Sequence, residues 1–429
     1  MKKLLALLLT AVLAVGCVAF TGCSEDTRTK VGLITLHDEN STYDKNFIDA
    51  FKAACKVKNV RALIKTGVEE DASVETNASE LVEAGCKLVF ADSFGHEPYL
   101  RNAAKAYPSV QFAHATGTST QTDKSLKNFH NAFASIYEGR YIAGYAAGLK
   151  LAAMYTADKA IAKEGVITVG YVGAYDYAEV KSGYTSWLLG VRAGFAAKVT
   201  DAITVNMIVE FTNSWYNEGY EKDSANALIK QGCVIISQHA DSWGAPTACE
   251  TAKVPNVSYN GSTESRCPET FIISSRVNWQ PYFEYIIDCV LNDKKIDDDW
   301  CGELGSTFAN GSVALTELGK KAPVEGTQAE LDKVAAALRN GSLKIFDTSK
   351  FTVKGGYAGG EFANLTDVKF DENGKLLSAK QNGLEVVKTA NGITYFAESD
   401  VKTNRSAPYF DMDIDGIKLS YRKDDTKTK

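Results

Sequence analysis

The chain has 429 residues, of which 45% are hydrophobic and 23% are charged, and its formal net charge at pH 7 is -6. This composition excludes a disordered or collagen-like chain, and the length predicts two or three packed units. Basic residues number 47 against 53 acidic ones, without a run of five Lys or Arg, so we expect no nucleic acid partner.

The N-terminus has the pattern of a secretory signal peptide. Two lysines open the chain, residues 4–20 are almost entirely apolar, and polar residues begin directly after Cys23. These flanks are typical of a cleaved signal rather than of a spanning helix. Because the residues before Cys23 resemble a bacterial lipobox, we expect removal of residues 1–22, lipidation of Cys23, and a linker over 23–29. Cys17 is an alternative lipidation site.

From Lys30 onward, short runs rich in β-branched residues alternate with longer segments of helical period. This alternation predicts parallel α/β units. The expected strands are 31–36, 60–65, 87–91, 110–113, 166–172, 203–210, 234–237, 257–259 and 271–274. The expected helices are 46–58, 73–84, 97–107, 136–155, 179–197, 218–231, 244–253 and 279–292.

The number of strands indicates two sheets rather than one, divided near residues 135–165. The predicted fold class is α/β, with two lobes that each hold a parallel sheet flanked by helices, and a hinge between them. We expect an N-terminal lobe of 30–135 plus about 263–300, a C-terminal lobe of 136–262 plus about 301–345, and a C-terminal extension of β hairpins over 346–429. Ligands bind beyond the carboxyl ends of strands in such sheets, so the site is expected in the cleft between the lobes.

Polar and aromatic residues recur directly after the expected strands. They occupy segments 37–47, 211–217, 238–243, 260–262 and 276–279. Each segment alone is more often a helix cap with a half-buried ring than a ligand contact, but their repetition at one topological place indicates a binding site. Aromatic rings stack on planar bases, and Asn, Asp, Ser and His supply directional hydrogen bonds. Since no cluster of Arg and Lys suggests a phosphate group, the pattern favours a flat, polar, aromatic ligand.

The sequence lacks the common motifs of catalysis and metal binding. It has no Walker loop, nucleophile elbow or HExxH pair, and the glycine-rich segment 355–360 is predicted to be a loop. Segment 411–416 begins like a calcium loop, but Arg422 stands where the closing Glu is needed, so a strand ending in a turn is predicted. We therefore expect neither a metal nor a cofactor.

Five motifs, in order along the chain, resemble those of the basic membrane protein family, the substrate-binding lipoproteins of ABC transporters. They are Tyr43-Asp44-Lys45-Asn46-Phe47, Tyr137-Glu138-Gly139-Arg140-Tyr141-Ile142-Ala143-Gly144, Asn213-Ser214-Trp215-Tyr216, Gln238-His239-Ala240-Asp241-Ser242 and Asn278-Trp279. The resemblance implies a type I periplasmic-binding-protein-like fold, a location outside the cytoplasm at the membrane, ABC permease partners, and no enzymatic activity. The better-known members bind purine nucleosides.

The resemblance also implies site residues. Phe47 and Trp215 are expected to stack on the ligand, one from each lobe, and His239 and Asp241 to approach it. Further expected contacts are Tyr43, His114, Asn260, Arg276 and Trp279. His114 and Asn260 stand where nucleoside-binding members carry acidic residues, and an Asn cannot accept from two sugar hydroxyls as a carboxylate does. A free nucleobase or another heteroaromatic compound therefore stays as open as a nucleoside.

Two other functions share these residues. A sensor outside the cytoplasm would use the same cleft, and an enzyme could use Asp241 and His239 for acid–base chemistry on a nucleoside.

The nine cysteines do not form a disulfide framework in this interpretation. Two belong to the signal and anchor segment, and the remaining seven are an odd number. We expect Cys55, Cys86, Cys233 and Cys289 to be buried thiols, and one disulfide is open among Cys249, Cys267 and Cys301.

Overall fold

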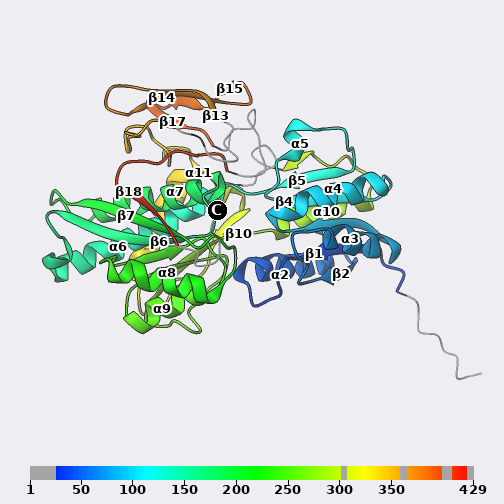
Figure 1. Cartoon of the computed structure of the whole chain (residues 1–429), viewed down its shortest axis with the longest axis horizontal. Helices are drawn as coiled ribbons and strands as arrows, with labels where there is room; N and C mark the ends of the chain where they lie inside the picture. Colours follow the sequence, from blue (N-terminus) through cyan, green and yellow to red (C-terminus); the bar gives the residue numbers. More distant parts are fainter. Residues whose placement is uncertain (1–25, 301–306, 358, 360–364, 399–407, 423–429) are drawn as a thin grey trace, which may run out of the picture.

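The computed structural model describes residues 26–300, 307–357, 359, 365–398 and 408–422. It has two lobes, each built on one large sheet with helices on both faces (Figure 1). The predicted two-lobe α/β fold is confirmed. Among the described residues, no helix is long and apolar enough to cross a bilayer.

The first lobe has a six-stranded parallel sheet in the order β11-β5-β4-β3-β1-β2. Its strands are β1 (Lys30–Ile34), β2 (Arg61–Lys65), β3 (Cys86–Ala91), β4 (Gln111–Ala115), β5 (Phe129–Ala132) and β11 (Asp299–Trp300). Its helices are α2 (Thr42–Val57), α3 (Ser73–Glu83), α4 (Glu97–Ala106), α5 (Ser119–Thr122) and α10 (Gln280–Leu291). Helices α2 and α10 share one hydrophobic core with the sheet, and α3 and α4 share another.

The second lobe has a seven-stranded sheet in the order β12-β10-β9-β8-β6-β7-β18. Its strands are β6 (Val166–Gly173), β7 (Thr204–Phe211), β8 (Ile236–Gln238), β9 (Asn256–Tyr259), β10 (Phe271–Val277), β12 (Val313–Leu315) and β18 (Ile417–Tyr421). Its helices are α6 (Ile136–Ala157), α7 (Ala178–Ala196), α8 (Glu218–Lys230), α9 (Gly244–Ala252) and α11 (Thr327–Arg339). Only β12 runs antiparallel to its neighbour in the described sheet.

One expected boundary between the lobes is wrong. Residues from about 263 were expected in the first lobe, but β10 pairs with β9 and β12 in the second sheet. The chain crosses to the first lobe only after Val277, where α10 and β11 follow. A short apolar strand suits either sheet, because its partner is set by the topology of the whole lobe rather than by its own residues.

The C-terminal extension contains the expected hairpins. Strands β13 (Leu365–Phe370), β14 (Leu376–Gln381) and β15 (Leu384–Glu385) form one antiparallel sheet, and β16 (Val387–Ala390) and β17 (Ile393–Phe396) form a hairpin. The turn residues Asn391 and Gly392 both have positive φ, as a type I′ turn requires. The extension also forms part of the second lobe, because its strand β18 pairs in parallel with β7 at the edge of the second sheet (Figure 1).

All six cysteines in the described part of the chain are buried free thiols: Cys55, Cys86, Cys233, Cys249, Cys267 and Cys289. The expectation of mostly free thiols is confirmed for these residues, and Cys249 does not pair with Cys267. Cys17, Cys23 and Cys301 lie outside the described residues.

Helices α6 and α7 approach each other through glycines. A Cβ atom on Gly190 of α7 would lie 2.1 Å from the carbonyl oxygen of Tyr141, and one on Gly144 of α6 would lie 2.2 Å from that of Trp187. Real Cβ atoms do not come this close to backbone oxygens. The two helices therefore pack at a distance that only glycine permits at these positions.

Gly190→Ala is expected to lower the free energy of unfolding by about 1–3 kcal/mol, because the added methyl group meets backbone that cannot rotate away. Urea denaturation measures this change. The control is Gly219→Ala on α8, where the nearest atom to a new Cβ is the Asn217 side-chain oxygen at 3.4 Å. The control should be neutral or stabilising, and equal losses in both variants would contradict the packing argument.

Candidate functional site

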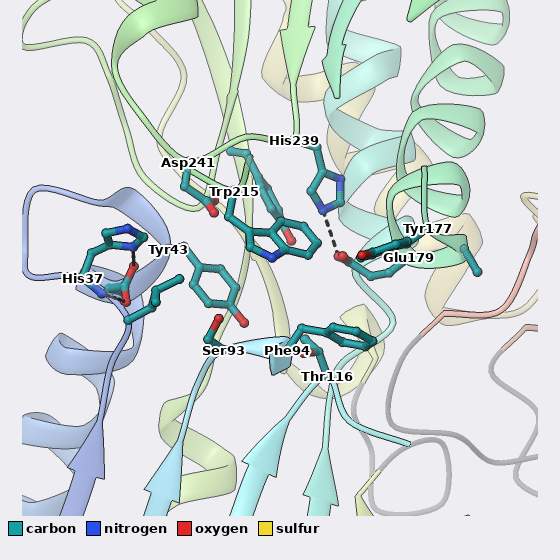
Figure 2. A pocket seen from close by; sticks show the side chains of 14 residues that line it. His37, Tyr43, Ser93, Phe94, Thr116, Tyr177, Glu179, Trp215, His239 and Asp241 are labelled. Carbon is teal, nitrogen blue, oxygen red and sulfur yellow. Dashed lines mark hydrogen bonds and ion pairs between the residues drawn. The ribbon is translucent and has the colours of Figure 1, made fainter. Parts of the chain in front are cut away.

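A cavity of about 690 Å³ lies between the lobes (Figure 2). Its first-lobe lining consists of Leu36, His37, Tyr43, Asp44, Ser93, Phe94 and Thr116, and its second-lobe lining of Tyr177, Ala178, Glu179, Trp215, His239, Asp241 and Tyr259. These residues end strands, follow them, or open the next helix. The cavity is therefore at the carboxyl ends of both sheets, where ligands bind in open α/β folds.

Aromatic rings from both lobes surround this space (Figure 2). Trp215 follows β7, and its ring centroid lies 6.0 Å from that of Tyr177, which precedes α7. Tyr177 in turn lies 5.6 Å from Phe94 of the first lobe. Tyr43, in the first turn of α2, donates its hydroxyl to the backbone oxygen of Asp92 at 2.8 Å. The cavity thus offers several apolar ring surfaces to a ligand.

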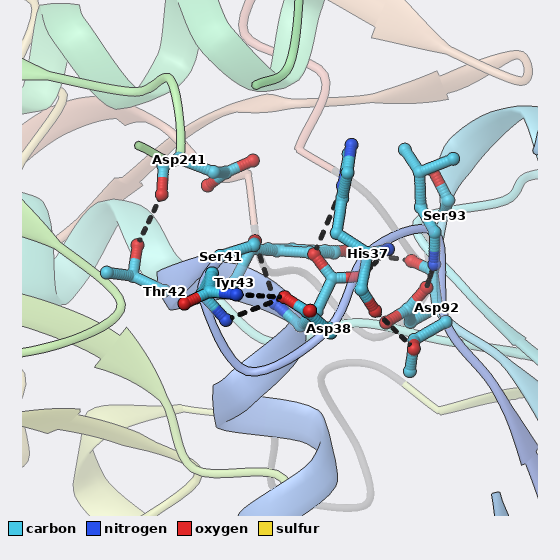
Figure 3. Close-up of polar contacts among 12 residues, drawn as sticks. His37, Asp38, Ser41, Thr42, Tyr43, Asp92, Ser93 and Asp241 are labelled. Carbon is cyan, nitrogen blue, oxygen red and sulfur yellow. Dashed lines mark hydrogen bonds and ion pairs between the residues drawn. The ribbon is translucent and has the colours of Figure 1, made fainter. Parts of the chain in front are cut away.

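The lobes touch each other beside the cavity. The backbone N–H and the hydroxyl of Thr42 both donate to the carbonyl oxygen of Asp241, at 3.2 and 3.0 Å (Figure 3). The rings of His37 and Tyr216 also meet across the lobes, with centroids 4.9 Å apart. The two lobes are therefore in contact with each other beside the cavity.

The loop before α2 is held by its own polar side chains (Figure 3). Ser41 caps the helix by accepting from the N–H of Asp44 at 3.2 Å, and the Asp44 carboxylate accepts from the N–H of His37 at 2.8 Å. Asp92, after β3, accepts from the N–H of Leu36 at 3.2 Å. These bonds fix Asp44 at the cavity wall.

The electrostatic character of the cavity is acidic. Asp44, Glu179 and Asp241 line it, and no Lys or Arg does so among the described residues. Burial, and then the charges of Asp44 and Glu221, raise the pKa of Asp241 well above its ordinary value. Asp44 and Glu179 therefore offer acceptor oxygens to a ligand that donates hydrogen bonds, whereas the protonated form of Asp241, which this shift favours, can also donate one.

Glu221 of α8 connects the two loops that carry Trp215 and Asp241. Its carboxylate accepts from the N–H of Ser242 at 3.1 and 3.2 Å and from the N–H of Asn217 at 3.2 Å. Burial raises the pKa of Glu221 to about 7, although these hydrogen bonds act in the opposite direction. Sequence reasoning missed this residue, because nothing in an amphipathic helix marks one Glu as buried.

This raised pKa predicts a pH dependence of stability. The folded chain keeps the Glu221 proton up to pH about 7, whereas the unfolded chain releases it near 4.5. Stability should therefore fall as pH rises through this window, by about 3 kcal/mol relative to Glu221→Gln, which lacks the titration. Urea denaturation at pH 4.5 and 8 tests this. Glu218→Gln, exposed on the same helix, is the control, and parallel pH profiles for wild type and Glu221→Gln would contradict the prediction.

Comparison with known proteins decides the family. The model for ABC transporter substrate-binding proteins of the PnrA-like (Bmp) type matches residues 34–304. The chain belongs to this family. The expected membership of the basic membrane protein family is thus confirmed, and the family consists of extracytoplasmic solute-binding components of ABC transporters. The matched range ends before the C-terminal extension.

Several relatives agree with this assignment. A purine-binding protein of Brucella abortus is 31% identical over 284 residues, 65% of this chain and 71% of the relative. A putative ABC transporter glucose-binding protein of Haloferax volcanii is 31% identical over 268 residues, 62% of this chain and 60% of the relative. The solved structure of an ABC transporter solute-binding protein of Aeropyrum pernix covers 74% of this chain and 93% of its own, with a TM-score of 0.60 and 15% identity. This last likeness shows the fold.

Four residues expected in the ligand site of this PnrA-like protein line the cavity: Tyr43, Trp215, His239 and Asp241. Two others do not. Phe47 and Trp279 are 0% and 1% exposed, and their rings stack on each other at 4.4 Å in the first-lobe core. The expected role of Phe47 is wrong because α2 begins at Thr42 rather than at Asn46. Phe47 therefore faces the sheet, and Tyr43, one turn earlier, reaches the cavity.

The remaining three expected residues lie behind or beside the cavity. His114, at the end of β4, is buried and donates from Nε2 to the carbonyl oxygen of Ser93 at 2.6 Å. Asn260 does not line the cavity, but its side-chain N–H donates to the Asp241 carboxyl group at 3.3 Å. Arg276, together with Asn260, lines a separate cavity of about 1,000 Å³, where it donates to the side-chain oxygen of Asn46 at 3.2 Å.

Sequence reasoning missed Phe94, Tyr177 and Glu179, which line the cavity. Phe94 follows β3, and Tyr177 and Glu179 follow β6. The rule that located Trp215 and Asp241, to inspect the residues after each strand, applied to β3 and β6 as well. The same rule, applied to β3 and β6, would therefore have identified these three residues.

Proposed function

We propose that this chain binds a purine-type nucleobase or nucleoside in the interlobe cavity and delivers it to an ABC permease. Lipid attached at Cys23 would hold it at the outer face of the cell membrane. The observation that carries the proposal is the combination of aromatic rings from both lobes with three carboxyl groups and no Lys or Arg among the described lining residues. The purine-binding relative from Brucella abortus supports the same ligand class.

The chemistry of the cavity explains this preference. The rings of Trp215, Tyr177, Tyr43 and Phe94 provide surfaces for a planar base, and the carboxyl groups accept its N–H donors or the hydroxyls of a sugar. A nucleotide would bring phosphate charges against these carboxyl groups. Binding would stabilise the arrangement in which the lobes meet at Thr42 and Asp241, because only there do both sets of rings contact the ligand.

Trp215→Ala is expected to weaken purine binding by about 1–3 kcal/mol, the contribution of one stacked base. Titration calorimetry measures the change in affinity. Trp215→Phe is the matched control, since it keeps a ring at the same position and should retain most of the affinity. Unchanged affinity in Trp215→Ala would contradict a stacking role for this residue.

Mass spectrometry of whatever co-purifies with the protein, followed by calorimetry with adenine, guanine, adenosine, guanosine, AMP and glucose, tests the ligand class. Binding of a base or nucleoside without binding of AMP is the expected result. Binding of glucose alone would overturn the proposal in favour of a sugar, the ligand named for the Haloferax relative. Recovery of the ligand unmodified would support binding without catalysis, and release of free base from a nucleoside would revive the enzymatic alternative.

A further inference from the structure

Arg140 of α6 is buried beneath the cavity at 1% exposure. Nη1 donates to the carbonyl oxygen of Gln238 at 2.7 Å, and Nη2 donates to Nδ1 of His239 at 3.1 Å. Its Cζ atom lies 3.3 Å from the ring centroid of Tyr259. Among the described residues, no carboxylate forms an ion pair with Arg140. The groups in contact with its guanidinium are those of Gln238, His239 and Tyr259.

The hydrogen bonds around His239 determine where its proton lies. A guanidinium group has donors only, so Nδ1 of His239 must accept from Arg140. In the neutral imidazole the proton is then on Nε2, which donates to Oε1 of Glu179 at 3.0 Å (Figure 2). This chain of Arg140, His239 and Glu179 runs from the interior of the second lobe to the cavity wall.

The position of Glu179 follows from this chain. Its side chain is 14% exposed and lines the cavity. Oε1 accepts from His239 at 3.0 Å, and among the described residues no further hydrogen bond to the Glu179 carboxylate is formed. Glu179 therefore has one oxygen that fixes its orientation and one that is available to a ligand.

Gly183 of α7 leaves room for the arrangement. A Cβ atom at this position would lie 3.2 Å from Nδ1 of His239 and 3.6 Å from Nε of Arg140. A larger residue would crowd the two side chains at the hydrogen bond that joins them. The glycine at this position of α7 therefore leaves space for the hydrogen bond between Arg140 and His239.

We propose that Arg140 is a positioning residue of the ligand site, which fixes the Nε2–H tautomer of His239 and thereby sets Glu179 as the acceptor for an N–H or O–H donor of the ligand. The proposal rests on the proposed function, because it assigns part of the recognition of that ligand. With Glu179 held in this way, the site favours purines that present a donor group to it, such as an exocyclic amine or a ring N–H. A ligand that offers only acceptors there leaves Glu179 unpaired and is disfavoured.

The environment of His239 makes the proposal testable by pH. Burial lowers the pKa of His239, the charge of Glu179 raises it and that of Arg140 lowers it, with a net downward shift. The other groups that face His239 are the hydroxyl of Tyr171, 3.5 Å from Nδ1, and the ring of Tyr259, 5.0 Å away. Removing the charge of Arg140 removes one of the two effects that lower this pKa, so His239 should take up a proton more readily as pH falls.

The test compares Arg140→Met, Arg140→Lys and Glu179→Gln with wild type. Calorimetry from pH 5.5 to 8 measures affinity for the purine that wild type binds best, and ¹⁵N NMR reports the tautomer of His239. We expect wild type to show neutral Nε2–H and affinity that changes little with pH. Arg140→Met should lose affinity about tenfold between pH 8 and 5.5, because the imidazolium that forms at His239 pairs with the Glu179 carboxylate and weakens it as an acceptor for the ligand. Arg140→Lys should restore much of the flat profile. Glu179→Gln should bind about 10- to 100-fold more weakly at every pH.

Two results would overturn the inference. One is an affinity loss in Arg140→Met that is equal at every pH with an unchanged His239 tautomer, which would show a purely structural role. The other is wild-type affinity in Glu179→Gln. If Arg140→Met does not fold, Glu179→Gln and the His239 tautomer of wild type carry the decision, since a wild-type Nδ1–H tautomer would contradict the role of Arg140. The tautomer measurement needs no ligand, so failure of wild type to bind any purine would reject the proposed function separately.

Discussion

Trp279→Ala is expected to lower the free energy of unfolding by about 3–5 kcal/mol, the usual cost of removing a large ring from a packed core. The Trp279 side chain is 1% exposed and stacks on Phe47 at 4.4 Å. It also lies 5.9 Å from Phe90 and 6.1 Å from Tyr282, measured between ring centroids. Alanine would leave a cavity among rings that belong to three different elements. Urea denaturation followed by circular dichroism measures the loss.

Trp215→Ala is the matched control for this experiment, because Trp215 is only partly buried and lies at the cavity. It should lose ligand affinity with a much smaller change in stability, whereas Trp279→Ala should lose stability first. If Trp279→Ala kept wild-type stability and lost only ligand binding, Trp279 would be a ligand-binding residue, and its assignment to the core would be wrong.

The lobes and most strands could be predicted because their signals are local. The run over 203–210 reads as one strand from its β-branched residues, and the structure has β7 over Thr204–Phe211. Positions directly after strands gave Trp215, His239 and Asp241 for the same reason. The topology of a parallel sheet brings such positions to one edge, so no knowledge of side-chain packing was needed.

The errors arise where non-local packing decides. Phe47 was assigned to the site by resemblance to the family motif, but α2 begins at Thr42, four residues earlier than expected, and places this ring in the core. The pairing of β18 with β7 joins residues about two hundred positions apart, and short strands carry no mark of their partner. Likewise, the acidic segment 411–415 is not a strand, and its carboxylates pair with cations of α7.

Lys181 of α7 shows how the C-terminal extension reaches the ligand site. Its ammonium group lies 3.5 Å from Asp411, 3.3 Å from Asp413 and 3.4 Å from Asp176. Asp411 and Asp413 belong to the extension, and Asp176 belongs to the loop that carries Tyr177 into the cavity. Burial alone would lower the pKa of Lys181, but the charges of Asp413, Asp176 and Asp411 raise it above its ordinary value. Lys181 therefore keeps its charge at neutral pH.

Lys181→Met should lower the free energy of unfolding by about 3–5 kcal/mol, because it removes a buried ammonium group that lies within 3.5 Å of three carboxylates. The side chains of Lys181 and Asp411 are 8% and 2% exposed, so water cannot replace the lost partner. Urea denaturation at pH 7 measures the loss, and adding Asp411→Asn should recover part of it, because the two residues interact directly.

Lys380→Met is the control for this prediction, since its 2.7 Å ion pair with Asp367 lies on the surface of the same extension. Exposed pairs contribute about 0–1 kcal/mol, so the control should change stability little. Because Asp176 stands next to Tyr177, Lys181→Met should also weaken ligand binding in the molecules that remain folded. A stability loss no larger than that of Lys380→Met would mean that other contacts, among them the pairing of β18 with β7, hold the extension, and that the carboxylates around Lys181 contribute nothing to the site.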